Sequence, residues 1–136
     1  MAHVSDIVIC LKANNMDEGV TANTILSAIT PEYIPGLFTF SVIVILLDLE
    51  ENGIHKLEVK FSDPNGENVV QLETDLPAVP SMVINSSLPK EYRGINIAMD
   101  WNNVNFKISG VYELKVYYDG NEVGTKQIYV KGKNEK

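Results

Sequence analysis

One cysteine, Cys10, and two histidines, His3 and His55, are the side chains of this chain best suited to nucleophilic chemistry. A cysteine becomes a strong nucleophile when a neighbouring imidazole or cation stabilises its thiolate. The spacing of these residues does not bring them together, and Cys10 lies in the apolar run IVICL, where a free cysteine behaves as a small hydrophobe. His55 follows a turn, which is typical of an exposed or capping imidazole. We therefore expect no catalytic residue and no enzyme activity.

Metal binding would require a different set of residues. A structural zinc site uses four Cys or His ligands, and the chain has three such residues. Oxygen donors suited to calcium gather in two predicted loops, DPNGE with Asp63, Asn65 and Glu67, and DLEEN with Asp48, Glu50, Glu51 and Asn52. An EF-hand needs a longer ligand spacing and a distal Glu, and turn chemistry explains Asp, Asn and Gly in such loops. We expect no metal and no cofactor.

The charged residues that remain do not form a catalytic motif. The chain has no GxSxG elbow, HExxH helix or phosphate-binding Gly-rich loop. Paired carboxylates for glycoside hydrolysis would need a cleft, and the acidic pairs Asp17-Glu18 and Glu50-Glu51 are typical of solvated loops. The sequence therefore indicates no catalytic class, and the secondary structure determines how these side chains are positioned.

Strands are the elements that the sequence predicts. In HKLEVKFS, residues 55–62, Leu57, Val59 and Phe61 share one face while charged residues occupy the other. This period of two indicates a strand with one dry and one wet side. The turn DPNG follows it, and the segment Val111–Val130 predicts a hairpin around Asp119-Gly120. In this hairpin the inward face carries Tyr112, Leu114, Val116 and Tyr118.

Strand signals recur along the whole chain between Gly, Asn, Asp and Pro residues. A loop is expected at Lys12–Gly19, and a hairpin-type connection at Glu50–Gly53, where Asn-Gly takes positive φ readily. The other predicted strand segments are Val4–Leu11, Thr21–Ile29, Leu37–Leu49, Glu67–Thr74, Met82–Leu88 and Ile95–Trp101. Eight or nine strands result, which predicts an all-β fold: one domain, residues 1–136, as a two-sheet antiparallel β-sandwich.

The strand Leu37–Leu49 is apolar on both faces. Phe38, Phe40, Val42, Val44 and Leu46 would fill the core, while Ile43, Ile45 and Leu47 lie on the opposite face. A strand of this kind is usually covered on both sides. The cover can be the region Lys12–Gly36 or a second copy of the chain, and we predict that Ile43, Ile45 and Leu47 border a homo-oligomer contact.

Aromatic side chains on an outward strand face can stack on sugars or anchor a protein partner, although cross-strand packing explains them equally well. Tyr117 and Tyr129 have the parity of outward residues and are the candidate contacts. Trp101 shares its parity with Ile97 and Met99, so we expect it inside.

Composition narrows the partners. The chain has 136 residues and a formal charge of −7, with 18 acidic and 11 basic residues. This charge disfavours nucleic acids and anionic membranes, which are bound through clustered Lys and Arg. The longest apolar run is too short and too polar to span a bilayer. A single cysteine and the lack of an evident signal peptide favour a cytoplasmic location.

Three blocks, FTFSVIV, HKLEVKFSDPNG and GVYELKVYYDGNEVGTKQIYV, resemble a family of short uncharacterised bacterial and phage proteins. The patterns are HxLxVxFxDPxG and GxYxxxVxxDGxxVG, over the last two thirds of the chain. The resemblance implies an immunoglobulin-like β-sandwich and no catalytic residue. Gly110-Val111-Tyr112 also resembles the tyrosine corner of such domains, in which a Tyr hydroxyl bonds to upstream backbone.

The chain is therefore expected to be a non-catalytic interaction or assembly module of bacterial or phage origin. Its partner would be an unknown protein or a second copy of itself. A carbohydrate-binding or calcium-dependent module that uses Tyr117 and the DPNGE loop is the alternative.

Overall fold

The computed structural model describes residues 2–16, 19–49, 53–76 and 88–135. Within these ranges the chain forms nine strands and one turn of 3-10 helix at Lys90–Tyr92. The strands are β1 (His3–Met16), β2 (Gly19–Ile25), β3 (Ala28–Ile29), β4 (Gly36–Leu47), β5 (His55–Ser62), β6 (Asn68–Leu76), β7 (Gly94–Phe106), β8 (Gly110–Tyr118) and β9 (Asn121–Val130). A helix able to cross a bilayer is not found among the described residues.

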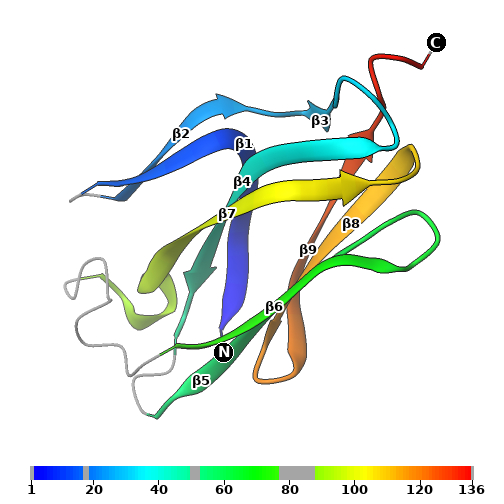
Figure 1. Ribbon diagram of the computed structural model, residues 1–136. Helices are drawn as coiled ribbons and strands as arrows, with labels where there is room; N and C mark the ends of the chain where they lie inside the picture. Colours follow the sequence, from blue (N-terminus) through cyan, green and yellow to red (C-terminus); the bar gives the residue numbers. More distant parts are fainter. Residues whose placement is uncertain (1, 17–18, 50–52, 77–87, 136) are drawn as a thin grey trace.

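The strands form two sheets that pack face to face (Figure 1). One sheet has the order β2-β1-β4-β7 and the other β3-β9-β8-β5-β6. The paired neighbours run antiparallel, except that the short strand β3 runs parallel to the end of β9. The predicted all-β sandwich of two mainly antiparallel sheets is therefore confirmed.

The core lies between the two sheets and follows the alternation of the sequence. Leu57, Val59 and Phe61 of β5 are fully buried, as their shared parity predicts. The same holds for the inward residues of β8, where only Tyr118 keeps slight exposure. Strands β4 and β9 add Phe40, Val42, Val44, Leu46, Ile128 and Val130, and β7 adds Trp101, Val104 and Phe106.

Aromatic rings fill the centre of the core. The ring of Phe61 contacts those of Phe40, Trp101, Phe106 and Tyr112 at centroid distances of 5.4–6.2 Å, and Phe40 also contacts four rings. Edge-on and tilted pairs of this kind are the favoured arrangements of aromatic rings. Trp101 is buried as expected, and its Nε1 has no hydrogen-bond partner within the described part of the chain.

Two predicted connections differ from the structure. The hairpin expected at Glu50–Gly53 is wrong, because β4 and β5 belong to different sheets and do not pair with each other. An Asn-Gly pair indicates a reversal of the chain but not the sheet that the next strand joins. Residues 50–52 of this segment, and all of the expected strand Met82–Leu88 except Leu88, lie outside the described residues.

The loop expected at Lys12–Gly19 is also wrong. Strand β1 continues to Met16 and β2 begins at Gly19, so the described residues of this segment belong to a long antiparallel pair, which we call the hairpin. β1 pairs with β4 only from His3 to Cys10, and beyond Cys10 it pairs with β2 alone.

This hairpin packs on the outer face of β4 and β7. Its Ala13 is buried together with Cys10 and Ile43, and Val20, Ala22 and Ala98 pack around them. Gly19 lies beside Asn96 of β7, and a Cβ there would be 3.5 Å from the Asn96 side-chain nitrogen. The region after Lys12 thus covers the second apolar face of β4 and forms a small second core.

Candidate binding surface

Cys10 and the two histidines do not meet. Cys10 is fully buried beneath the hairpin, and this burial raises the pKa of its thiol. His3 lies seven residues away on the same strand, which is roughly 23 Å in extended chain. His55 belongs to the other sheet, where its ring stacks on Tyr118 at 5.1 Å. The described residues therefore contain no thiol-imidazole pair.

His55 instead joins the start of β5 to the turn after β8. Its Nδ1 lies 2.6 Å from Oδ2 of Asp119, whose Oδ1 accepts a hydrogen bond from the Lys56 backbone N–H at 2.8 Å. The Lys56 bond, followed by the His55 bond, lowers the pKa of Asp119. A carboxylate held in this way fixes the conformation of the turn, and its lowered pKa makes it a weaker base.

The oxygen donors of the DPNGE loop are organised by the turn itself. Asp63 Oδ1 accepts hydrogen bonds from the backbone N–H of Asn65 at 2.8 Å and of Glu67 at 3.0 Å. The Gly66 N–H donates to the Asp63 carbonyl at 2.9 Å. Of the DLEEN loop, residues 50–52 lie outside the described residues. In the described ranges, three or more Cys, His, Asp or Glu side chains do not gather in an arrangement that could hold a metal.

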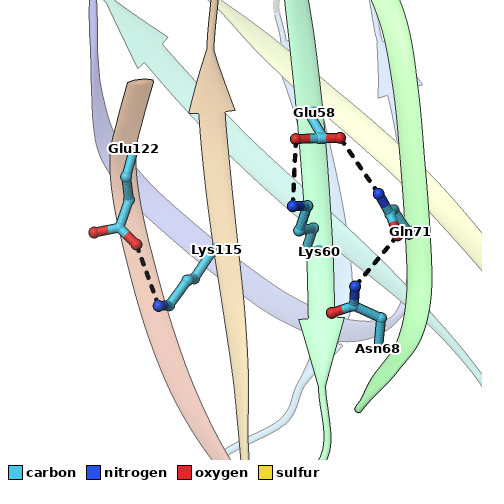
Figure 2. A network of polar contacts seen from close by, with 6 residues as sticks. All are labelled: Glu58, Lys60, Asn68, Gln71, Lys115 and Glu122. Carbon is cyan, nitrogen blue, oxygen red and sulfur yellow. Dashed lines mark hydrogen bonds and ion pairs between the residues drawn. The ribbon is translucent and has the colours of Figure 1, made fainter. Parts of the chain in front are cut away.

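The outer face of the five-stranded sheet carries a lattice of paired charges (Figure 2). Glu58 of β5 contacts Lys60 at 3.8 Å and accepts a hydrogen bond from Gln71 of β6 at 3.4 Å, and Asn68 in turn donates to Gln71 at 3.2 Å. On β8, Lys115 contacts Glu113 at 3.3 Å and Glu122 of β9 at 3.5 Å. We call these seven residues the polar lattice.

The lattice explains how like charges are accommodated. Lys60 and Lys115 lie directly opposite each other in the β5–β8 pair, an arrangement that is destabilising when uncompensated. Each ammonium group has a carboxylate partner, and Lys60 Nζ also lies 5.1 Å from the centroid of the Tyr117 ring. This distance suits a cation–π contact, so Tyr117 is half-buried beneath Lys60.

Tyr129 lies on the same face as Tyr117 but at the far end of it. Its side chain is 52 % exposed and stands directly opposite Val111, which is 47 % exposed. We call Val111 and Tyr129 the apolar pair. Val111 and Tyr117 are six residues apart on β8, roughly 20 Å, so the two candidate tyrosines do not form one contact site.

Two of the three predicted interface residues of β4, Ile43 and Ile45, belong to the small second core beneath the hairpin, and Leu47 does not. Ile43 is 5 % exposed, and Ile45 packs against the same small core. Leu47 is half-buried near the end of the strand. The hairpin supplies a cover within one chain, and a contact between copies at these residues stays a prediction.

One polar cluster was not predicted from the sequence. Ser41, a buried residue of β4, donates from Oγ to Asp100 Oδ1 of β7 at 2.5 Å. Lys12 of the hairpin contacts Asp100 Oδ2 at 3.0 Å. The Ser41 bond, followed by the Lys12 contact, lowers the pKa of Asp100. The only signal in the sequence was a serine at an apolar outer position of β4.

Comparison with solved structures identifies the class of fold. An immunoglobulin-like protein from Pseudomonas aeruginosa matches with a TM-score of 0.52 and 12 % identity, over 96 % of this chain and 97 % of that chain. The expected immunoglobulin-like sandwich is therefore confirmed. Tyr112 supports the match, because its hydroxyl donates to the Ile108 carbonyl at 2.7 Å as in a tyrosine corner.

The chain belongs to DUF6941, a family of unknown function, whose model matches residues 5–131. A Pseudomonas fluorescens alkylpurine DNA glycosylase, AlkC, is similar over 96 % of this chain and 30 % of its own, with 7 % identity and a TM-score of 0.48. A glycosyl hydrolase family 2 member from Bacteroides cellulosilyticus is similar over 74 % and 12 %, with 14 % identity and a TM-score of 0.47. No curated protein sequence matches the chain. The predicted bacterial or phage origin stays a prediction.

Proposed function

We propose that this protein is a non-catalytic interaction module that binds a protein partner through the outer face of its five-stranded sheet. The observation that carries the proposal is the apolar pair. Val111 and Tyr129 stand opposite each other on adjacent strands, and about half of each side chain is exposed. Tyrosine is enriched at protein interfaces because it combines a large apolar ring with a hydroxyl group.

The neighbouring polar lattice supports the same role. Its charged groups are paired within the sheet and held on rigid strands, so a partner would meet a face that is already ordered. An ordered face loses less side-chain entropy on binding than a mobile one. The lattice would form the polar rim of a contact centred on the apolar pair, and it would fix the orientation of the partner.

The class of partner follows from charge. With a formal charge of −7, the chain attracts a protein with a basic or neutral surface more readily than nucleic acid or an anionic membrane. A second copy of the chain is the other candidate occupant. We propose that the partner is another cytoplasmic protein. The mass of the complex distinguishes such a partner from a second copy of the chain.

Site-specific photo-crosslinking tests this proposal. A photoreactive phenylalanine derivative replaces Tyr129 in the cells that naturally make the protein. Tyr92 serves as the matched control, because it is 60 % exposed and lies in the 3-10 helix, outside the five-stranded sheet. We expect a discrete adduct from position 129 and none from position 92, with a mass that distinguishes a second copy from another protein. Equal yields at both positions, or no adduct at all, would contradict the proposal.

A carbohydrate-binding or calcium-dependent module has weaker support. One face of the Tyr117 ring is occupied by Lys60 Nζ, which competes with a stacking sugar. In the DPNGE loop, one oxygen of Asp63 is already engaged by two backbone N–H groups. Binding to a glycan array, with and without calcium, separates this alternative from the leading proposal.

A further inference from the structure

A cavity of about 230 Å³ opens at one end of the sandwich, and its lining includes neither residue of the apolar pair. It lies between the β5–β6 turn and the β7–β8 loop, which emerge at the same end of the molecule (Figure 1). We call it the turn pocket. It is lined by Asp63, Glu67, Asn68, Val69, Asn105, Lys107 and Tyr112.

The walls of the turn pocket are fixed by contacts between the two connections. Gly110 lies against Pro64 of the DPNG turn, where a Cβ would be 2.7 Å from Pro64 Cγ, and its φ of +137° also favours glycine. Tyr112 holds the β7–β8 loop through the Ile108 carbonyl, and Asp63 holds the β5–β6 turn. The cavity is therefore preformed, as small-molecule sites usually are.

The polar groups that line this cavity do not satisfy one another. In the described part of the chain, Lys107, Glu67 and Asn105 make no side-chain hydrogen bond or ion pair. Six other lysines, Lys12, Lys56, Lys60, Lys90, Lys115 and Lys133, have acidic partners, whereas Lys126 and Lys131 resemble Lys107 in having no ion pair among the described residues. The turn pocket thus presents one cationic group, Lys107, and two anionic groups, Asp63 and Glu67. These groups can form further hydrogen bonds with a ligand.

We propose that the turn pocket binds a small zwitterion, a free α-amino acid. The ligand's carboxylate would pair with the Lys107 ammonium group, and its own ammonium group would donate to Glu67 and to the second carboxylate oxygen of Asp63. The amides of Asn68 and Asn105 can donate to or accept from either end. The cavity is smaller than the roughly 300–1,000 Å³ typical of drug-sized ligands, which suits a single amino acid.

Two other ligand classes fit this cavity less well. Sugar sites commonly offer an exposed aromatic face, whereas Tyr112, the aromatic residue that lines the pocket, is fully buried. A divalent cation would meet only two carboxylates and would be repelled by Lys107. A ligand that carries both charges leaves none of the three groups without a partner.

NMR titration of the isotopically labelled protein tests the proposal. Glycine, serine and glutamine are added one at a time, and the amide shifts around Glu67 and Lys107 are followed. We expect saturable shifts in the turn pocket with an affinity in the roughly millimolar range. The N-acetylated, C-amidated form of the same amino acid lacks both charges and should cause no saturable shift. Methyl glucoside and calcium chloride are titrated in parallel.

Charge-removing variants locate the site. Lys107→Gln and Glu67→Gln should each weaken amino-acid binding about tenfold, because each removes one charged hydrogen-bond partner. Lys56→Gln and Glu73→Gln remove an ion pair that does not line the pocket, and they should leave binding unchanged. Equal binding of the blocked form, binding of only the sugar or calcium, or no saturable shift with any amino acid would overturn the proposal. The photo-crosslinking result at Tyr129 is independent of all these outcomes.

Discussion

His55 and Asp119 join the two longest sequence patterns of the chain, with Nδ1 and Oδ2 2.6 Å apart. His55 begins the HKLEVKFSDPNG block, and Asp119 belongs to the turn of the GVYELKVYYDG block. At the other end of the same β5–β8 pair, Pro64 packs against Gly110. These four residues of the two patterns therefore stabilise the two ends of the β5–β8 pair, and their role is structural.

Replacing Asp119 by Asn should reduce both stability and its dependence on pH. Attachment to Lys56 N–H and His55 lowers the Asp119 pKa from its ordinary value of 3.8. Because the pKa of this carboxyl group is lower in the folded than in the unfolded protein, its ionised form stabilises the fold at pH values above the unfolded-state pKa. This contribution to stability is lost as the pH falls through the lower pKa of the folded state. We expect a loss of about 0.5–1 kcal/mol at neutral pH, after allowing for solvent exposure.

The measurement is urea unfolding across the acidic range. The wild-type protein should lose more stability than Asp119→Asn between about pH 5 and pH 2, since only the wild-type carboxylate takes up the proton. Parallel curves for the two proteins over this range would show that the attachment of Asp119 contributes nothing.

Replacing Tyr112 by Phe should cost stability through a single lost hydrogen bond. The Tyr112 hydroxyl is the donor to the Ile108 carbonyl at 2.7 Å, and the ring is fully buried. Leaving this acceptor without its partner should lower the free energy of unfolding by about 1–2 kcal/mol. Thermal or urea unfolding measures the loss, and Tyr129→Phe, at an exposed position, is the control. Equal stability of the two variants would remove the tyrosine corner from the account.

Replacing Asp100 by Asn should loosen the hairpin over β4 and β7. Asp100 connects Lys12 of the hairpin to Ser41 of the sheet, and Cys10 lies buried beneath. We expect Cys10 to react several-fold faster with a thiol reagent in the folded variant than in the wild-type protein. Hydrogen exchange at Ala13 and Ala22 should rise in step, which separates local opening from general destabilisation.

Asp75→Asn is the control for this experiment, because Asp75 is an exposed residue of β6 in the other sheet. If thiol reactivity rises equally in both variants, the Asp100 contacts do not hold the hairpin down.

Replacing Gly124 by Ala should strain the contact between the two sheets at β1 and β9. An added Cβ would lie 2.5 Å from Cβ of Val4, a part of the side chain that cannot rotate away. We expect a loss of about 1–3 kcal/mol, the usual cost of overpacking. Chemical denaturation measures it, and Gln127→Ala, an exposed change on the same strand, should stay within about 0.5 kcal/mol of the wild type. A neutral Gly124→Ala would mean that the sheets are not this close.

Local patterns were enough to predict most of the described strands and the buried faces of β5 and β8. The period of two placed Leu57, Val59 and Phe61 in the core, and the Gly-Val-Tyr sequence predicted the tyrosine corner. What a local pattern lacks is the identity of the partner strand. This is why the Asn-Gly pair after β4 predicts a hairpin although β5 belongs to the other sheet.

The contacts that create possible sites join distant parts of the chain. Lys12 and Asp100 are 88 residues apart, and the turn pocket brings Asp63 of the β5–β6 turn together with Lys107 of the β7–β8 loop. No spacing in the sequence reveals such pairs before the strand order is known. Tyr117 and Tyr129 lie on one outer face, but their separation along that face and the contact of Tyr117 with Lys60 follow only from the strand register.

The most direct test of the proposed function is chemical footprinting of tyrosine side chains by mass spectrometry. Labelling in the cells that make the protein is compared with labelling of the purified protein. Tyr129, Tyr33 and Tyr92 are 52 %, 68 % and 60 % exposed, so all three are labelled in the purified protein. We predict that, of these three tyrosines, Tyr129 alone is protected in the cell. Unchanged labelling of Tyr129, or protection of Tyr33 and Tyr92 instead, would contradict it.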